Sequence, residues 1–279
     1  MVALDPRINP FRPEIAAKYL QGQVKAARFV EGVRHEVVEP IAALRRTPSH
    51  EARLDTQALL GERVIIYETT DEGWAWGQLE TDRYVGWLSA NALGAPGAAP
   101  THKVSVPRTL GFPGPDIKLA PAVALPMGAR LAIARQDERF AVTAHGWHLP
   151  IAHLAPIKAR QADFVAAAEE FLHAPYLWGG KTSLGIDCSG LVQVALQAAG
   201  YACPRDSDMQ ELALGKLSSL GELRRGDFVF WKGHIAIARD GETLLHANAH
   251  AMAVAIEPAA EAIARIKAAG SEITSVKRI

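Results

Sequence analysis

The sequence predicts an α+β domain in the C-terminal part of the chain, preceded by two small β-barrels and an N-terminal helical segment. Two observations predict this fold class. Between residues 33 and 157, short alternating or β-branched runs are separated by Gly, Pro, Asp and Ser, a pattern typical of small barrels. From residue 158 onward helical spacing comes first and strand-like runs follow, which is an α+β layout.

The N-terminal segment, residues 1–32, is expected to contain one amphipathic helix over Pro13–Phe29. Proline suits the first turn of a helix. Ile15, Leu20 and Val24 belong to a set of apolar residues that recur at helical spacing. We expect this helix to pack on a neighbouring domain.

The two predicted barrels are residues 33–95 and 96–157, and they resemble each other. Gly86-Trp87-Leu88 in the first is similar to Gly146-Trp147-His148-Leu149 in the second, which suggests an internal repeat. A Gly- and Pro-rich stretch, 94–100, is the expected linker. The tryptophans of the first barrel are expected in its core, with Tyr84 as the aromatic residue most available to a ligand.

The C-terminal domain, residues 158–279, reads as a series of helices and strands. The helices are expected over 162–172, from Cys188 to Ala199 with Gly200 as the terminating cap, over 208–214 with Ser207 as N-cap, and over 258–268. The strands are expected over 227–231, 234–238, 243–247, 252–256 and 273–279.

Cys188 is a candidate nucleophile because it follows a glycine-rich loop and begins a helix. Helix N-termini carry unpaired N–H groups and a positive dipole end, so the sequence predicts a stabilised thiolate there. The competing interpretation is a small buried hydrophobic residue, which describes most free cysteines. The histidines that follow favour the nucleophile.

His234 and His246 lie at the start and the end of two consecutive predicted strands. If Asp240-Gly241 forms the hairpin turn, the strands are antiparallel and the two imidazoles become cross-strand neighbours. Thiol catalysis needs a base beside the sulfur and a third group that orients the base. We therefore expect His234 to be the base and His246 to orient it.

Composition excludes several other classes of function. The 279 residues include 30 basic and 30 acidic side chains, so no basic excess indicates nucleic acid or an anionic membrane surface. No signal peptide, lipidation motif or membrane-spanning stretch is recognised, which predicts a cytoplasmic location. The two cysteines, Cys188 and Cys203, indicate neither a disulfide framework nor a zinc site, so no cofactor is expected.

Six motifs in this order resemble those of the NlpC-type bacterial cell-wall peptidases, which are papain-like cysteine peptidases. They are Tyr176–Gly180, Asp187–Leu191, Arg205–Gln210, Gly226–Trp231, Gly233–Ile237 and Leu245–Ala247. The two upstream barrels resemble bacterial Src-homology-3-like domains. The combination is similar to cytoplasmic γ-D-glutamyl-L-diamino acid endopeptidases of cell-wall peptide recycling, and implies a murein peptide as substrate.

The resemblance also implies a mechanism and a substrate site. Cys188 attacks the γ-D-glutamyl amide, and Tyr176 is the implied second oxyanion donor beside the Cys188 N–H. Asp187, Ser189 and Ser207 match positions that bind the free amine of an N-terminal L-Ala. The first barrel is implied to add a tyrosine, for which Tyr84 is the candidate, and an acid, for which Glu51 is preferred and Asp55 is the alternative.

Three other functions remain open from the sequence. A thiol acyltransferase or lipid-amide hydrolase uses similar sites, but no apolar acyl groove or membrane anchor is evident. A non-catalytic peptidoglycan-binding protein is the second, although the intact Cys188, His234 and His246 disfavour it. A metal-dependent hydrolase is the third. The sequence does not distinguish meso-diaminopimelate from lysine, nor does it indicate an oligomeric state.

Overall fold

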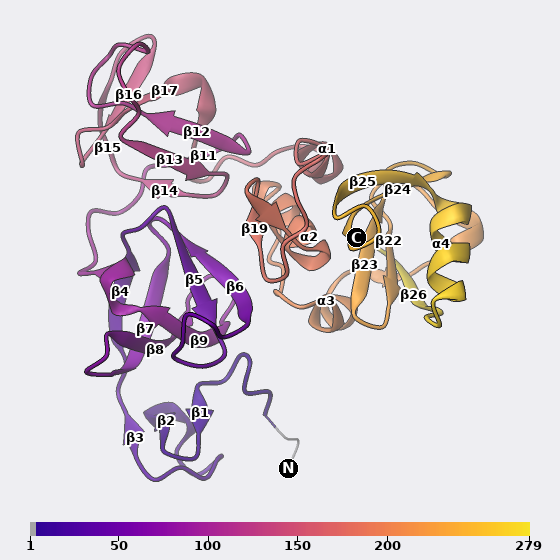
Figure 1. Ribbon diagram of the computed structural model, residues 1–279, viewed down its shortest axis with the longest axis horizontal. Helices are drawn as coiled ribbons and strands as arrows, with labels where there is room; N and C mark the ends of the chain where they lie inside the picture. The colour runs from indigo at the N-terminus through magenta and orange to yellow at the C-terminus, as the bar shows by residue number, and fades with distance from the viewer. Residues whose placement is uncertain (1–3) are drawn as a thin grey trace. The chain divides into compact units, whose positions relative to one another are not determined.

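A computed structural model describes residues 4–279 and divides the chain into two compact units (Figure 1). One unit ends at Ile157 and the other comprises Lys158–Ile279. Each unit is described separately below. The expectations for residues 1–3 lie outside the described residues.

The prediction of an N-terminal helix over Pro13–Phe29 is wrong. The segment instead forms β1 (Phe11–Arg12), β2 (Ile15–Ala17), the 3-10 turn η1 (Lys18–Leu20) and β3 (Phe29–Val30). All three residues of β2 are fully buried, a pattern that a helix with one apolar face does not produce. Ile15 packs with Trp74, Trp76 and Trp87, so tertiary burial of this short strand overrides helical spacing.

Residues 33–94 form an antiparallel seven-stranded sheet in the order β10-β4-β7-β8-β9-β5-β6. Its elements are β4 (Val33–Val37), β5 (Ile41–Arg45), β6 (Leu54–Leu59), β7 (Arg63–Thr69), β8 (Trp74–Leu79), β9 (Val85–Ser89), η2 (Ala90–Ala92) and β10 (Leu93–Gly94). The aliphatic core includes Leu44, Val64 and Leu88. The three tryptophans lie outside this core, in the cluster that Ile15 covers.

The following segment builds three smaller sheets, β14-β11-β18, β12-β13 and β15-β16-β17. The elements are β11 (His102–Val104), β12 (Arg108–Gly111), β13 (Val123–Pro126), β14 (Arg130–Leu131), β15 (Ile133–Gln136), β16 (Phe140–Thr143), β17 (His148–Pro150), η3 (Ile151–His153) and β18 (Leu154–Pro156). One pattern of the preceding sheet recurs here. In the preceding sheet, the Val37 carbonyl accepts from the Gly61 N–H, and the Val37 N–H donates to the Glu62 carbonyl. In this segment, Val104 makes the same two backbone bonds with Gly128 and Ala129.

The second unit contains an antiparallel six-stranded sheet in the order β21-β26-β22-β23-β24-β25. Its strands are β21 (Lys216–Leu217), β22 (Phe228–Trp231), β23 (His234–Ala238), β24 (Thr243–Asn248), β25 (Ala253–Pro258) and β26 (Ile273–Arg278). The helices are α1 (Phe164–Glu169), α2 (Cys188–Ala198), α3 (Ser207–Ala213) and α4 (Ala259–Ala268), and the short elements are β19 (Lys181–Thr182), β20 (Gly185–Ile186) and η4 (Leu220–Glu222). Helix α4 packs Ala259 and Ala262 onto Val229, Ala236 and Leu244 of the sheet.

The predicted elements of this unit are confirmed with small differences at their ends. Helix α2 begins at Cys188, and Gly200 has the left-handed backbone of a terminating residue, with φ of 82°. Helix α1 is shorter than predicted and begins after Asp163, whose side chain accepts from the Val165 N–H. The prediction for Ser207 is wrong, because it is the first residue of α3 and Asp206 is the N-cap.

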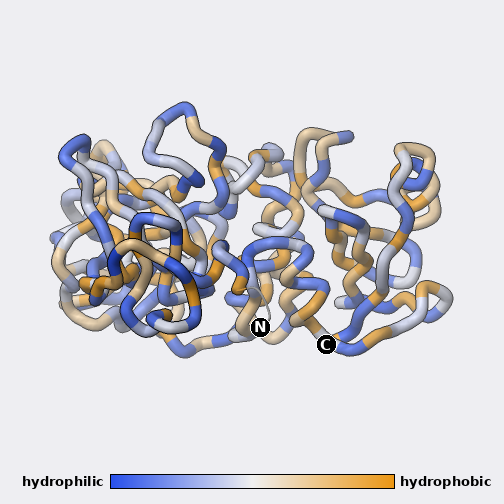
Figure 2. The backbone as a smooth tube through the Cα atoms, turned by 90° about the horizontal axis from the view of Figure 1, so that it is seen from below, coloured by the Kyte–Doolittle hydropathy of each residue, from blue (hydrophilic) through white to orange (hydrophobic). Residues whose placement is uncertain are grey.

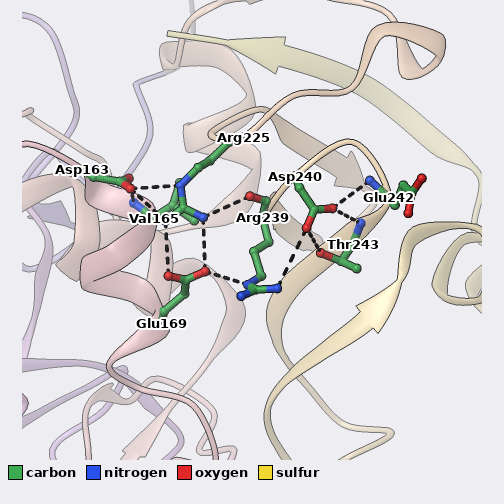
Figure 3. Close-up of polar contacts among 8 residues, drawn as sticks. All are labelled: Asp163, Val165, Glu169, Arg225, Arg239, Asp240, Glu242 and Thr243. Carbon is green, nitrogen blue, oxygen red and sulfur yellow. Dashed lines mark hydrogen bonds and ion pairs between the residues drawn. The ribbon is translucent and has the colours of Figure 1, made fainter.

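An ion-pair network joins α1 to the hairpin of β23 and β24 (Figure 3). Arg225 bonds both Asp163 and Glu169, and Arg239 bonds Glu169 at 2.7 Å. In the predicted turn, Asp240 accepts from the N–H groups of Glu242 and Thr243. The network therefore ties the hairpin that carries both candidate histidines to a helix from earlier in the chain.

Hydrophobic residues occur in short runs along the backbone (Figure 2). Among residues 4–279, no helix is both long enough and apolar enough to cross a membrane.

Candidate active site

The loop before α2 places Cys188 at the start of the helix. Asp187 is the N-cap, and its Oδ1 accepts from the Gly190 N–H at 2.7 Å. The carbonyl oxygen of Gly180 lies against the first turn of α2. A Cβ added to Gly190 would lie only 2.3 Å from this oxygen. Only glycine fits at residue 190, which explains the glycine two residues after the cysteine.

Asp187 and Arg205 form a buried ion pair beneath this loop. The Arg205 side chain is 1 % exposed and donates to both carboxylate oxygens, at 3.0 Å to Oδ1 and 2.7 Å to Oδ2. Arg205 also donates to Ser189 Oγ at 2.8 Å, and the Gly179 N–H donates to Asp187 Oδ2. Asp187 and Ser189 thus hold the loop together, a role that the sequence analysis did not predict.

The Cys188 sulfur is buried against strand β23. The peptide N–H groups of Ile235 and Ser189 donate toward the sulfur and favour the thiolate, as expected at a helix N-terminus. Burial nevertheless dominates, and together with the charge of Asp187 it raises the pKa of the Cys188 thiol to about 12. Burial therefore opposes the predicted stabilisation of the thiolate by the N–H dipoles in the free protein, and the thiolate stays a prediction.

The structure brings the two predicted histidines into direct contact. His234 Nε2 lies 2.9 Å from His246 Nδ1, across the ends of β23 and β24. Ile235, whose N–H faces the Cys188 sulfur, is the next residue after His234. The predicted cross-strand proximity of the imidazoles is confirmed, and the pair lies on the strand that contacts the cysteine.

His246 has a second partner that the sequence analysis missed. Its Nε2 lies 2.9 Å from Glu257 Oε1 on β25, and Asn248 and Arg265 also bond that carboxylate. The signal in the sequence was Glu257 itself, an acidic residue on the strand that follows the hairpin and pairs with the strand of His246. Arg205, by contrast, lies within a motif noted above, although its buried pairing with Asp187 was not predicted.

Tyr176 and Ser207 complete the predicted residues of this unit. Tyr176 is half-buried, and burial and the nearby charges of Cys188 and Asp187 raise the pKa of its hydroxyl. A β-bridge between Tyr176 and Ile186 places Tyr176 beside the segment that leads to Cys188. Ser207 is half-buried at the first turn of α3.

The predicted residues of the barrel lie in the N-terminal unit. Tyr84 is 2 % exposed and belongs to the aliphatic core, so the prediction that it stands apart from the core is wrong. It also lines a cavity of about 700 Å³ together with Asp55 and Arg46, which form an ion pair at 3.2 Å. Glu51 is exposed and does not belong to this lining. Between the two acids, the geometry favours Asp55 as the neighbour of Tyr84.

The contacting pair of a half-buried His234 and a buried His246 predicts a loss of stability in acid. Burial lowers the pKa of His234 to about 3 and lowers that of His246, whereas an unfolded histidine titrates near 6.5. Between these values the unfolded chain binds protons that the folded protein does not, so the free energy of unfolding falls as the pH decreases from 6.5. Urea unfolding at pH 7.5 and pH 5 measures this loss.

The control compares two histidine variants in the same unfolding experiment. His234→Gln is expected to lose less stability than wild type between the two pH values, because the titrating group is gone. His250→Gln, at an exposed position, is expected to retain the wild-type pH dependence. Equal pH dependence in wild type and His234→Gln would show that other groups cause the acid loss.

Comparisons with known proteins agree with this arrangement. Residues 44–93 match the bacterial dipeptidyl-peptidase SH3 domain, and residues 173–269 match the NlpC/P60 family. The crystal structure of an NlpC/P60 family protein from Bacillus cereus superposes with a TM-score of 0.74 at 20% identity. It covers 88% of this chain and 99% of that one, which shows a shared fold.

Two curated relatives carry the name γ-D-glutamyl-L-lysine dipeptidyl-peptidase. The protein from Bacillus subtilis is 28% identical over 221 residues, which span 69% of this chain and 72% of that protein. The protein from Bacillus cereus is 24% identical over 248 residues, which span 74% and 71%. The chain is thus a homologue of these peptidases and carries an NlpC/P60 domain of papain-like fold behind an SH3-like domain.

Proposed function

We propose that this protein is a cysteine endopeptidase that hydrolyses the γ-D-glutamyl–diamino acid bond of murein peptides with a free N-terminal L-Ala. The observation that carries the proposal is the helix-start cysteine beside a hydrogen-bonded pair of histidines. The names of the two relatives support the choice of bond. The matching hydrogen bonds at Val37 and Val104 support a second SH3-like barrel over residues 96–157.

In the proposed reaction, His234 removes the proton of the Cys188 thiol as the sulfur attacks the amide carbonyl. Burial raises the pKa of Cys188 and lowers that of His234, which favours the neutral thiol and the neutral imidazole before attack. The resulting imidazolium then protonates the leaving amine and a thioester remains. Water, activated by the neutral His234, hydrolyses the thioester and regenerates the thiol.

Tyr176 is proposed as an oxyanion donor beside the Cys188 N–H. Tyr176→Phe keeps the ring and removes the hydroxyl, so we expect kcat to fall about 100- to 1000-fold, as for loss of one oxyanion donor. KM is expected to change little because the bond strengthens in the transition state. Steady-state kinetics measure both constants, and a raised KM with unchanged kcat would instead place the hydroxyl in ground-state binding.

Asp187 is proposed to bind the substrate ammonium with help from Ser189 and Ser207. Arg205 already offsets much of the Asp187 charge, so the ammonium must approach a carboxylate that accepts several hydrogen bonds. The contributions of Tyr84 and of a barrel acid to this site stay predictions. A requirement for a free amine would restrict the enzyme to peptides released from the glycan, consistent with a recycling role in the cytoplasm.

The proposal is tested with L-Ala-γ-D-Glu-meso-diaminopimelate, its L-lysine counterpart, and the N-acetylated form of each. We expect cleavage of the free peptides at the γ-D-glutamyl bond and at least a tenfold loss on acetylation. The lysine and diaminopimelate forms identify the preferred diamino acid. Equal cleavage of free and acetylated peptides would overturn the free-amine requirement, and no cleavage of any peptide would overturn the proposed reaction.

A further inference from the structure

We propose that Glu257 is a positioning residue that sets which nitrogen carries the proton on both active-site histidines, and so leaves His234 Nδ1 as the base. The proposal rests on the proposed function in assigning chemistry to Cys188 and His234. Its starting point is a chain of contacts that runs from the β23–β24 hairpin across β25 to helix α4.

Glu257 contacts three polar side chains. Its Oε1 lies 2.9 Å from His246 Nε2, and it accepts from Asn248 Nδ2 at 3.0 Å and from Arg265 Nη2 at 2.8 Å. Its Oε2 accepts from the same Arg265 nitrogen at 2.6 Å. The His246 side chain is fully buried, whereas Glu257 is 17 % exposed, so the carboxylate meets the imidazole at the margin of the interior.

The carboxylate of Glu257 is ionised at neutral pH. Burial works to raise the pKa of Glu257, but the hydrogen bonds from Arg265 and His246 outweigh it and lower the pKa overall. An ionised carboxylate only accepts hydrogen bonds. His246 Nε2 must therefore carry a hydrogen and donate it to Glu257.

The proton on His246 Nε2 determines which nitrogen of His234 carries a hydrogen. Burial keeps His246 neutral by lowering its pKa, so its Nδ1 has no hydrogen and only accepts. Because His234 Nε2 lies 2.9 Å from that Nδ1, His234 must carry its hydrogen on Nε2. Neutral His234 then has a bare Nδ1, which is the nitrogen available to take the Cys188 proton.

Glu257 acts through proton placement more than through its charge. Arg265 bonds both carboxylate oxygens and offsets the negative charge locally. When His234 becomes an imidazolium, its Nε2–H still donates to His246, so neither imidazole has to turn during the reaction. Without the acceptor at residue 257, His246 is free to carry its hydrogen on Nδ1, where it opposes the His234 Nε2–H.

Nitrogen chemical shifts of histidine side chains test the proton placement directly in the full-length protein. In wild type, we expect both His234 and His246 to carry hydrogen on Nε2 in spectra of ¹⁵N-histidine-labelled protein at pH 7.5. Glu257→Met is expected to shift His246 toward the Nδ1–H form. A wild-type spectrum with hydrogen on His246 Nδ1 would overturn the proposal, whatever the variants do.

Activity of three variants separates positioning from a structural role. Glu257→Met is expected to lower kcat about 10- to 100-fold with KM unchanged, by analogy with carboxylates that orient metal-binding histidines, whose loss has an effect of this size. Glu257→Gln keeps one acceptor oxygen and is expected to recover most of this loss. Arg265→Met breaks the same ion pair but leaves the acceptor, so its kcat should stay within threefold of wild type. Equal losses in Glu257→Met and Arg265→Met would assign Glu257 a merely structural role.

Alkylation of Cys188 by iodoacetamide provides a test that needs no substrate. Glu257→Met is expected to require a higher pH than wild type for half-maximal alkylation, because His234 less often presents a bare nitrogen. Arg265→Met should follow the wild-type pH profile, and peptide mapping confirms the labelled cysteine. If no murein peptide is cleaved, the proposed function fails while the spectra and alkylation profiles still decide the role of Glu257. Unchanged spectra and profiles in Glu257→Met would refute that role alone.

Discussion

Replacing Cys188 with alanine is expected to abolish hydrolysis of γ-D-glutamyl peptides, with a fall in kcat of about 10⁴- to 10⁶-fold, the range for removing one member of a catalytic triad. The alanine variant retains the helix and the Asp187 cap but has no atom to form the thioester. Cys188 is buried, but the substitution removes only its sulfur atom, so folding should be preserved. Substrate depletion followed by chromatography measures the residual rate.

Cys203 supplies the matched control for this substitution. It is also buried, and its sulfur accepts from Gln210 Nε2 at 3.4 Å, so removing it makes a comparable change in the same unit. Cys203→Ala is expected to retain activity within a few-fold of wild type. Activity in Cys188→Ala, or its loss only in Cys203→Ala, would exclude Cys188 as the nucleophile.

The strands and helices of the second unit were predictable because their signals are local. The short apolar runs of β22–β24 and the Asp240 turn place His234 and His246 on one hairpin, and the glycine pattern places Cys188 at a helix start. The N-terminal segment was not predictable in this way. Its helical spacing is real, but burial of Ile15 against the tryptophans of a later hairpin decides its conformation.

The charged partners of the site were harder to predict than its reactive groups. Arginine and glutamate are mostly exposed in proteins, so a sequence alone favours the surface for both. Arg205 becomes buried because Asp187, already needed as a helix cap, provides its counter-charge. Glu257 enters the site because β25 pairs with β24. The buried pairing of Arg205 depends on a contact between separate elements, whereas the role of Glu257 depends on the register in which β25 pairs with β24.

Loss of Arg205 is expected to give the largest change in stability. Arg205→Met removes the partner of the buried Asp187 carboxylate and leaves an uncompensated charge, which typically costs about 3–5 kcal/mol. The loop from Gly179 to Gly190 depends on the same carboxylate, so Cys188 should also lose its position and activity should fall. Urea unfolding and peptide hydrolysis of one preparation measure the two effects.

Two further variants separate the effect of breaking the buried ion pair from the effect of losing the Arg205 side chain. Lys267→Ala breaks an exposed pair with Glu272 and should change the free energy of unfolding by less than about 1 kcal/mol. Adding Asp187→Asn to Arg205→Met removes the stranded charge, so the double variant should be less destabilised than the sum of the single variants. Additive losses would mean that Arg205 stabilises the loop by packing, and that its pairing with Asp187 contributes little. A coupled loss would show that one buried ion pair supports both the helix start and the position of Cys188.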